Sequence, residues 1–288
     1  MFGRRERLET KAPHELRAMR RAGLVVASTL ETVTIQAAAG ITTGQLDDLA
    51  RESILGQGAR PSFPEVPGYR HTLCVSVNEA VVHGIPGERK LHDGDLVSVD
   101  CGAIVDGWHA DAAVTFVVGG DEAGSAQDLA LNEATRHALW AGIVAFRDGN
   151  HVGDIGAAVE ESIAQAMQRS SAGLDGRPCA YGIVEGFEGH GIGRAMHMEP
   201  GVPNVRVRDR GPRIRVGAAV AIEPMITLGS SDTYDLEDGW TAATVDGSRA
   251  AHWEHTVAVT RTGLWVLTAL DGGQAELLAR GGPFGPLD

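Results

Sequence analysis

Apolar residues recur at helical spacing in the first stretch of the chain. Within residues 13–39 the apolar series is Leu16, Met19, Leu24, Ala27 and Leu30. Pro13 suits the first turn, so this stretch is predicted to be a helix. A second helix is predicted from Thr42, because Thr42 and Gln45 have the spacing of a capping box. The same periodicity predicts helices at about 127–147 and 154–169.

Short runs rich in β-branched residues alternate with these helices. They lie at residues 72–77, 96–101, 114–118, 218–228 and 254–260. Runs of this length and composition are typical of strands. Helices and strands grouped in this way predict an α+β fold.

The order of elements occurs twice along the chain. The segment 40–44 precedes one predicted helix, and the similar segment 149–153 precedes another. Gly94 stands six residues before Asp100, and Gly217 stands six residues before Glu223. Chance similarity is the alternative, but two matching registers favour a duplicated half. Such a duplication predicts pseudo-twofold symmetry, with acids from both halves meeting at the centre.

A hairpin is predicted around Asp106-Gly107, a preferred two-residue turn. With that turn at the tip, Asp100 and Asp111 face the same side as diagonal neighbours about 7–8 Å apart. Two like charges on one face repel unless a cation lies between them. The spacing suits two metal ions about 3.5–4 Å apart, and a solvated hairpin face is the alternative.

The second half of the sequence supplies further candidates. His190 lies among glycines that allow close backbone approach, and His197 follows it. Glu223 ends an apolar strand, where a buried carboxylate needs a partner, and Glu254 stands at the start of the predicted strand at 254–260. Taken singly, each could be a structural histidine or a surface acid. Together with the hairpin acids, one imidazole and four carboxylates suit two divalent ions, of manganese, iron, cobalt or zinc, in a hydrolase.

Composition excludes several other classes of protein. The 288 residues include 25 Lys and Arg against 38 Asp and Glu, which gives a net charge of −13. This balance argues against broad binding to DNA or to an anionic membrane, although a local basic patch could still dock a partner. Three cysteines, Cys74, Cys101 and Cys179, form no disulfide framework and favour a reducing compartment. No secretory signal and no apolar segment of about 18 residues is present, so we expect a cytoplasmic protein.

The motifs taken together resemble those of type I methionine aminopeptidases, of the bacterial kind without an N-terminal zinc-finger extension. The resemblance runs from about residue 13 to residue 268. It rests on the segments at 78–86, 93–100, 106–111, 189–194, 196–197, 222–225, 238–241 and 253–256.

This resemblance implies a pita-bread fold, in which two pseudo-twofold related α+β halves surround a dinuclear metal site. It divides the chain into an extension (1–12), a catalytic domain (13–268) and a C-terminal tail (269–288) that matches nothing familiar. The implied ligands are Asp100 on one metal, Asp111 and Glu254 bridging both, and His190 and Glu223 on the other.

The resemblance also implies how catalysis works. Glu223 would shuttle a proton to the leaving amine, His197 would donate to the developing oxyanion, and His83 would contact the scissile nitrogen. The methionine side chain would lie in a pocket that includes Cys74, Met196 and Trp240, with His83 and His197 beside it. Met196 stands where the family often has an aromatic residue. The segment 60–69 departs from better-known relatives, so no pocket residue is assigned from it.

The implied activity is removal of the initiator methionine from nascent proteins and peptides with a small second residue. The expected partners are nascent polypeptide N-termini and, transiently, the ribosome, but not DNA or a membrane, and the chain is expected to be a monomer. A prolyl-directed aminopeptidase or dipeptidase is one alternative, but those enzymes usually carry a long N-terminal domain. A pita-bread binding module that has lost its metals is another. It should have broken ligand positions, whereas all five are acids or histidine here.

Overall fold

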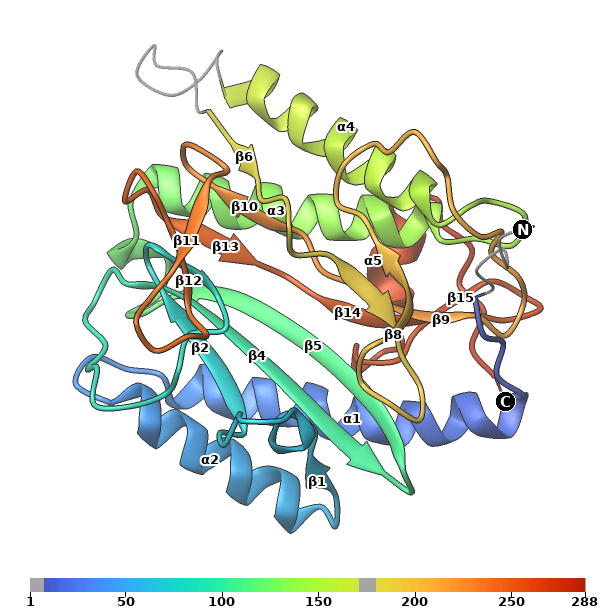
Figure 1. The fold of residues 1–288 in the computed structure, drawn as a ribbon, viewed down its shortest axis with the longest axis horizontal. Helices are drawn as coiled ribbons and strands as arrows, with labels where there is room; N and C mark the ends of the chain where they lie inside the picture. The colour runs from blue at the N-terminus through green and yellow to red at the C-terminus, as the bar shows by residue number, and fades with distance from the viewer. Residues whose placement is uncertain (1–7, 171–179, 288) are drawn as a thin grey trace.

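The computed structural model describes residues 8–170 and 180–287, so Cys179 and the start of the predicted extension lie outside the described residues. Helices form two outer layers, and the strands lie between them (Figure 1). The helices α1 and α2 lie along one side, and α3 and α4 lie along the other. Such an arrangement of two helix-covered halves matches the predicted α+β pita-bread fold.

The first half begins with α1 (Pro13–Gln36) and α2 (Thr43–Gly56). Thr42 accepts the Gln45 backbone N–H, and the Gln45 side chain returns to the Thr42 N–H, which confirms the predicted capping box. The first helix ends at Gln36, three residues earlier than predicted, because Ala37 turns to an extended conformation. The chain then meets residue 91, whose carbonyl accepts the Gly40 N–H.

Both helices pack on a four-stranded sheet. Its strands are β1 (Arg60–Pro61), β2 (Leu73–Val77), β4 (Leu96–Val105) and β5 (Trp108–Val117), in the order β1-β4-β2 with β5 paired to β4. The hairpin register is confirmed: Asp100 lies opposite Ala113, and Asp111 lies opposite Gly102. Asp106 and Gly107 both have positive φ, at 53° and 73°, as a tight hairpin turn requires. The strand predicted at 114–118 starts earlier, because the turn pairs β5 along its whole length.

The second half begins with α3 (Ala126–Ala145) and α4 (Gly153–Ser170). Its five-stranded sheet has the order β15-β14-β9-β7-β8. These strands are β7 (Gly189–Gly191), β8 (Met198–Val202), β9 (Ala219–Ile222), β14 (His255–Val259) and β15 (Leu264–Val266). The single run predicted at 218–228 is two strands, since the chain leaves the sheet at Glu223-Pro224 before β10 (Met225–Thr227).

Shorter elements complete the fold. One small sheet has the order β13-β10-β6, from β13 (Ala250–His252), β10 (Met225–Thr227) and β6 (Gly182–Ile183). Another has the order β11-β12-β3, from β11 (Thr233–Asp235), β12 (Ala242–Thr244) and β3 (Ala80–Val82). Two 3-10 turns are η1 (Phe63–Glu65) and η2 (Asp121–Ala123).

The C-terminal segment folds back onto the second half. Its helix α5 (Gln274–Ala279) buries Leu277 in the core beneath α3, and Glu276 pairs with Arg136 of that helix. Arg20 of α1 donates to the backbone carbonyls of Leu267 and Leu270. Among the helices of the described residues, none is long and apolar enough to cross a bilayer.

Candidate metal centre

A ladder of hydrogen bonds joins the two halves and carries two of the predicted ligands. The chain before and into β14 runs antiparallel to β5, and Glu254 exchanges backbone hydrogen bonds of 3.0 and 3.3 Å with Ala113. Next along the ladder, the Thr256 hydroxyl accepts the Asp111 N–H at 2.9 Å and donates to the Asp111 carbonyl at 2.8 Å. This register brings Glu254 of the second half beside Asp111 of the first.

His190 lies in β7, between β8 and β9. A Cβ on Gly189 would lie 2.4 Å from the Ala221 carbonyl, and one on Gly191 would lie 2.4 Å from the Glu199 carbonyl. The flanking glycines therefore let three strands approach closely. The ring Nδ1 of His190 lies 3.0 Å from the Gly191 carbonyl. Since a carbonyl only accepts, Nδ1 carries the hydrogen and Nε2 keeps a free lone pair.

Glu223 follows β9 and faces the same centre. Its Oε1 lies 3.5 Å from Nε2 of His190, and its backbone carbonyl accepts a hydrogen bond of 3.0 Å from the Asn204 amide. The side chain is only 13% exposed. A carboxylate this buried needs a partner, and a cation bound by both this oxygen and the His190 nitrogen would supply one.

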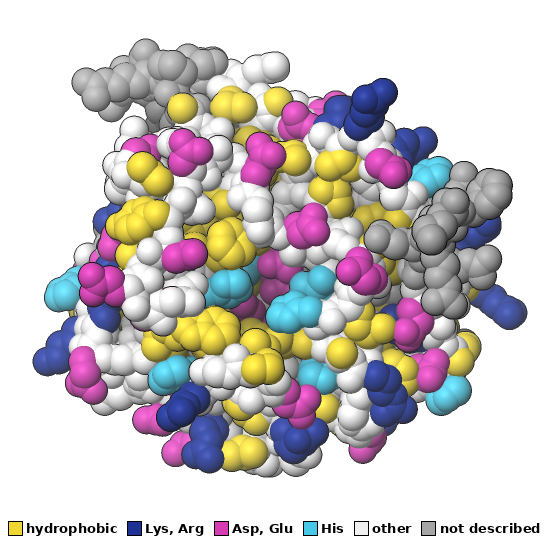
Figure 2. Space-filling model, viewed as in Figure 1, with side chains coloured by type: hydrophobic (Ala, Val, Ile, Leu, Met, Phe, Trp, Pro, Cys, Tyr) yellow, Lys and Arg dark blue, Asp and Glu magenta, His cyan; other side chains and the backbone are white. Residues whose placement is uncertain are grey.

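The predicted ligands converge in the hollow at the centre of the face seen in Figure 2, where acidic side chains and histidines gather between apolar ones. Ligand atoms of Asp111, His190 and Glu254 lie within 4.8 Å of one another, and the Asp100 carboxylate lies close enough to that of Asp111 for each to affect the other's pKa. Within the described residues, Oδ1 of Asp100, Oδ1 of Asp111 and Oε1 of Glu254 are buried without a hydrogen-bond partner. Buried acceptors of this kind fit the oxygen ligands of divalent ions.

The pKa shifts of these groups also favour bound divalent cations. Burial, reinforced by the neighbouring carboxylates, raises the pKa of Asp100, Glu223 and Glu254 well above the usual range, and burial also raises that of Asp111. Burial lowers the pKa of His190 to about 4, so its imidazole is neutral. Two divalent cations would balance four ionised carboxylates, and the neutral imidazole is the form that binds metal.

The two predicted catalytic histidines lie beside this cluster. The ring of His197 packs edge-on against that of His190, with 4.5 Å between centroids. His83 follows β3 with a positive φ of 60°, an uncommon conformation for this residue, and its ring packs against Phe187. The His83 backbone thus turns out of the strand, and the ring lies close enough to His197 for that residue's charge to add to burial in lowering the pKa of His83.

Cys74, Met196 and Trp240 come together as predicted. Cys74 and Met196 are buried in one apolar cluster with Phe63 and Tyr69, and Trp240 packs against it. The Tyr69 ring lies 5.0 Å from the Trp240 ring, and its hydroxyl donates to the Leu73 carbonyl at 2.7 Å. Sequence reasoning missed Phe63 and Tyr69. Their signal was two aromatic residues in the Pro- and Gly-rich segment 60–69.

His252 is a further residue that sequence reasoning missed. It is 1% exposed, and its Nε2 lies 3.8 Å from Oε2 of Glu223. Burial lowers its pKa to about 3. Its position two residues before Glu254 was the available signal, because alternate residues of an extended chain share a face.

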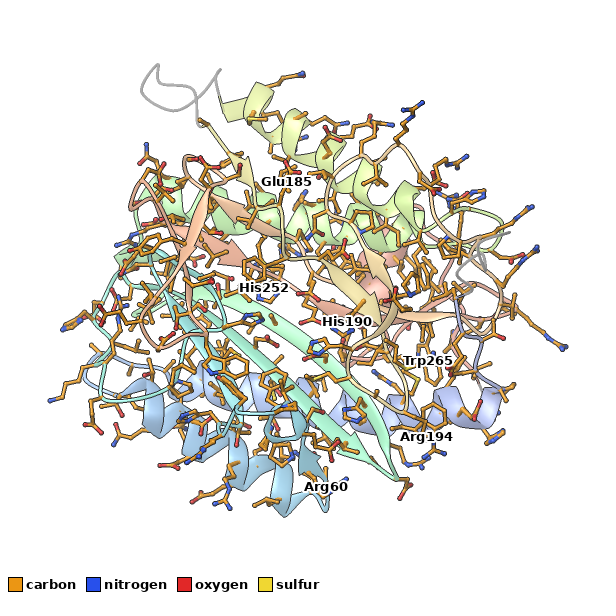
Figure 3. The ribbon with its side chains drawn as sticks, in the orientation of Figure 1. Arg60, Glu185, His190, Arg194, His252 and Trp265 are labelled. Carbon is orange, nitrogen blue, oxygen red and sulfur yellow. The ribbon has the colours of Figure 1, made fainter. Side chains whose placement is uncertain are left out.

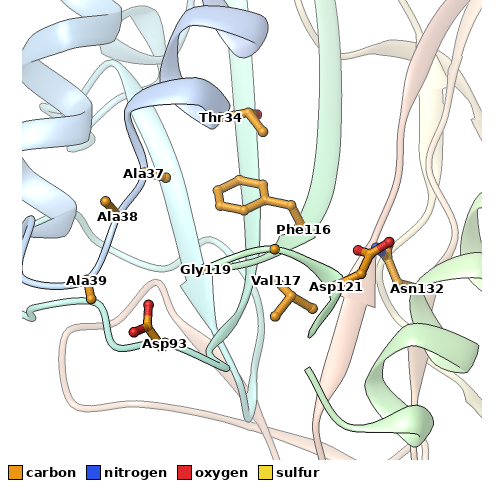
Figure 4. Close-up of a pocket in the computed structure, with 11 residues that line it drawn as sticks. Thr34, Ala37, Ala38, Ala39, Asp93, Phe116, Val117, Gly119, Asp121 and Asn132 are labelled. Carbon is orange, nitrogen blue, oxygen red and sulfur yellow. The ribbon is translucent and has the colours of Figure 1, made fainter. Parts of the chain in front are cut away.

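Two other cavities lie along α1, and the clustered carboxylates of the candidate site line neither of them. One, of about 440 Å³, is lined by Thr34, Asp93, Phe116, Asn132 and neighbouring residues (Figure 4). The other, of about 460 Å³, shares Thr34 and Phe116 with it and is mostly apolar. None of the predicted site residues lines either cavity.

Comparison with known proteins agrees with this geometry. The profile of metallopeptidase family M24 matches residues 17–261. Methionine aminopeptidase 1 of Mycobacterium tuberculosis is 51% identical over 255 residues, which are 88% of this chain and 92% of that protein. The crystal structure of methionine aminopeptidase from Thermotoga maritima superposes with a TM-score of 0.83 at 36% identity, covering 91% of this chain and 99% of that one.

A more distant structure shares the fold alone. Prolidase from Pyrococcus furiosus is 16% identical with a TM-score of 0.67, and 90% of this chain aligns on 65% of that one. The prolyl-directed alternative therefore has much weaker support than the methionine-directed one. The chain belongs to metallopeptidase family M24 and, within it, to the bacterial methionine aminopeptidases.

Proposed function

We propose that this protein removes methionine from the free N-terminus of peptides and nascent proteins whose second residue is small. The observation that carries the proposal is the group of buried carboxylate oxygens without hydrogen-bond partners among the described residues. In the proposed site Asp100 would hold one divalent ion, His190 and Glu223 would hold the other, and Asp111 and Glu254 would contribute to both.

The bound ions would supply a nucleophilic water at neutral pH and polarise the scissile carbonyl. Glu223 would act as the general base that accepts a proton from the attacking water and as the acid that donates it to the leaving amine. His197, exposed at the edge of the site, donates to the oxygen on which negative charge develops. His83 contacts the scissile nitrogen.

The apolar cluster beside the carboxylates accounts for the choice of methionine. Cys74, Met196 and Trp240 form its wall, together with Phe63 and Tyr69. An apolar slot of this kind suits an unbranched thioether and excludes charged side chains. His83 and the adjoining wall restrict the space for the second residue of the substrate.

Further parts of the proposal rest on the family resemblance. We propose that the catalytic domain spans residues 13–268, flanked by 1–12 and 269–288. We also propose that the protein is a cytoplasmic monomer that acts on emerging chains and contacts the ribosome transiently.

A set of four peptides tests the proposed specificity. Met-Ala-Ser should release methionine efficiently, whereas Met-Lys-Ser, formyl-Met-Ala-Ser and Leu-Ala-Ser should be poor substrates. A bulky second residue that displaces the carbonyl by about 1 Å costs on the order of 10²-fold in rate. The released amino acid is measured by mass spectrometry with manganese-loaded protein.

The peptides differ in what they would disprove. Efficient cleavage of the formylated or the Met-Lys peptide would contradict the proposed requirement for a free N-terminus or for a small second residue, respectively. Cleavage of Leu-Ala-Ser as fast as Met-Ala-Ser would indicate a general aminopeptidase.

A further inference from the structure

We infer that His252 is a positioning residue for Glu223: its ring Nε2–H donates to Oε2 of Glu223 and orients that carboxylate toward the metal site. This inference rests on the proposed role of Glu223 as a ligand. It concerns a residue that the ligand set above does not include.

The ring of His252 and the carboxylate of Glu223 face each other in the interior. Nε2 of His252 lies 3.8 Å from Oε2, while Oε1 of the same carboxylate lies 3.5 Å from Nε2 of His190. Each oxygen of Glu223 thus faces one imidazole. His190 and His252 lie on either side of the centre of the molecule, over the β4–β5 hairpin (Figure 3).

The ring nitrogen Nε2 of His252 is buried and makes no hydrogen bond within the described part of the chain. The residue as a whole is 1% exposed. A buried polar nitrogen without a partner is costly, so its persistence calls for an explanation. The carboxylate of Glu223 lies within ion-pair distance of it.

The backbone holds this ring in place from the opposite half. The N–H of His252 meets the hydroxyls of Ser98 and Thr115 at 3.2 and 3.0 Å, and its carbonyl accepts from Thr115 at 2.7 Å. These two hydroxyls also contact each other, at 2.8 Å, across the β4–β5 pair. In β13, His252 pairs with Met225, two residues after Glu223. The ring therefore projects from a strand whose backbone is held by hydrogen bonds, and its position does not depend on the conformation of a loop.

The chemistry assigns the direction of the hydrogen bond. An ionised carboxylate only accepts, so the hydrogen of the neutral ring must lie on Nε2. The present 3.8 Å is longer than a hydrogen bond, and contacts of this kind often tighten in the loaded site. Carboxylates that bind metal are themselves held by such outer donors.

Two substitutions separate orientation from mere packing. His252→Leu keeps an apolar volume without the donor, and His252→Gln keeps an N–H donor. We expect His252→Leu to weaken Mn²⁺ binding by about 10–100-fold. His252→Gln should stay within about threefold of the parent. Binding is titrated calorimetrically into chelator-stripped protein without peptide, and the absorption spectrum of the Co²⁺-loaded protein should change with His252→Leu alone.

Thermal unfolding of the metal-free proteins tests whether His252 has a purely structural role instead. Because His252→Leu removes a buried nitrogen without a partner, its Tm should equal or exceed that of the parent. A purely structural role predicts a lowered Tm with unchanged Mn²⁺ affinity, and that result would overturn the inference. So would a His252→Gln variant that binds Mn²⁺ as weakly as His252→Leu.

A substitute variant and a control variant complete the test. If His252→Leu does not fold, His252→Met takes its place, since a flexible thioether fills irregular gaps. His137→Gln, on the outer face of α3 beside Glu133, is the control and should bind Mn²⁺ like the parent. Tight Mn²⁺ binding without cleavage of Met-Ala-Ser would contradict the proposed function. The assignment of His252 would still be decided by comparing the Mn²⁺ affinities of the parent and the His252 variants.

Discussion

At the residue scale, the site depends on which nitrogen of each histidine is free. Nδ1 of His190 is occupied by the Gly191 carbonyl, which leaves Nε2 for a metal. His197 is instead exposed at the edge of the site, with its ring against that of His190. The two histidines therefore differ in burial and in what holds their rings, which is why we propose different roles for them.

His197→Ala should lower kcat by about 10²–10³-fold, the usual cost of removing one donor to a developing oxyanion. The Michaelis constant for Met-Ala-Ser should change little, since the interaction is made in the transition state. Steady-state kinetics of the manganese-loaded variant check this. An effect mainly on KM would instead place His197 in ground-state binding.

Glu254→Gln should raise the Tm of the metal-free protein, and the difference from the parent should widen between pH 5 and pH 8. The pKa of Glu254 is raised by burial, so the folded state holds a proton that the unfolded state has lost. The carboxyl therefore costs stability as pH rises above its unfolded pKa, and glutamine does not. Scanning calorimetry in chelating buffer measures the difference.

Adding Mn²⁺ supplies the control for this experiment. Metal should raise the Tm of the parent more than that of Glu254→Gln, because a ligand that binds only the folded state stabilises it. A difference that stays constant with pH would mean that Glu254 is ionised in the metal-free protein.

At the scale of elements, the ladder between β5 and the chain before β14 places the acids of both halves side by side. Thr256 is its clearest member, since one hydroxyl serves both the N–H and the carbonyl of Asp111. Burial of Asp111 in the hairpin therefore depends on a contact from the other half.

Thr256→Val should destabilise the protein by about 1–3 kcal/mol, because it leaves buried backbone groups of Asp111 unpaired. Thr256→Ser keeps the hydroxyl and should lose less. Urea unfolding at equilibrium compares the two. Equal stability of the Val and Ser variants would show that the hydroxyl contributes nothing.

These elements also show what the sequence could predict. The hairpin register followed from Asp106-Gly107, because a two-residue turn determines which residues face each other. The ladder of Glu254 on β5 could not be predicted, since it joins residues far apart in the sequence. The pieces β6 and β11 are too short for periodicity to detect.

The motifs named residues that the structure brings together, whereas residues positioned by packing carried little signal. The five residues predicted to be ligands lie in one buried cluster, and their role as ligands stays a prediction. Tyr69 and His252 were missed for different reasons. Tyr69 lies in an irregular loop whose path the sequence does not determine, whereas His252 had a signal, its position two residues before Glu254 in the chain.

At the scale of the whole molecule, the site exists only when both halves are in place. Asp100 and Asp111 come from the first sheet, and His190, Glu223 and Glu254 come from the second half. The helices on both outer sides leave the strands facing each other across this centre. Removing a ligand from either half should therefore abolish the same activity.

The most direct measurement is methionine release from Met-Ala-Ser as Mn²⁺ is titrated into chelator-stripped protein, for the parent and for Asp111→Asn. The parent should be inactive without metal and recover with Mn²⁺. Asp111→Asn should stay at least about 10³-fold less active, because it loses a ligand proposed to hold both ions. Full activity after verified metal removal, or near-parental activity of Asp111→Asn, would contradict the proposed metal centre.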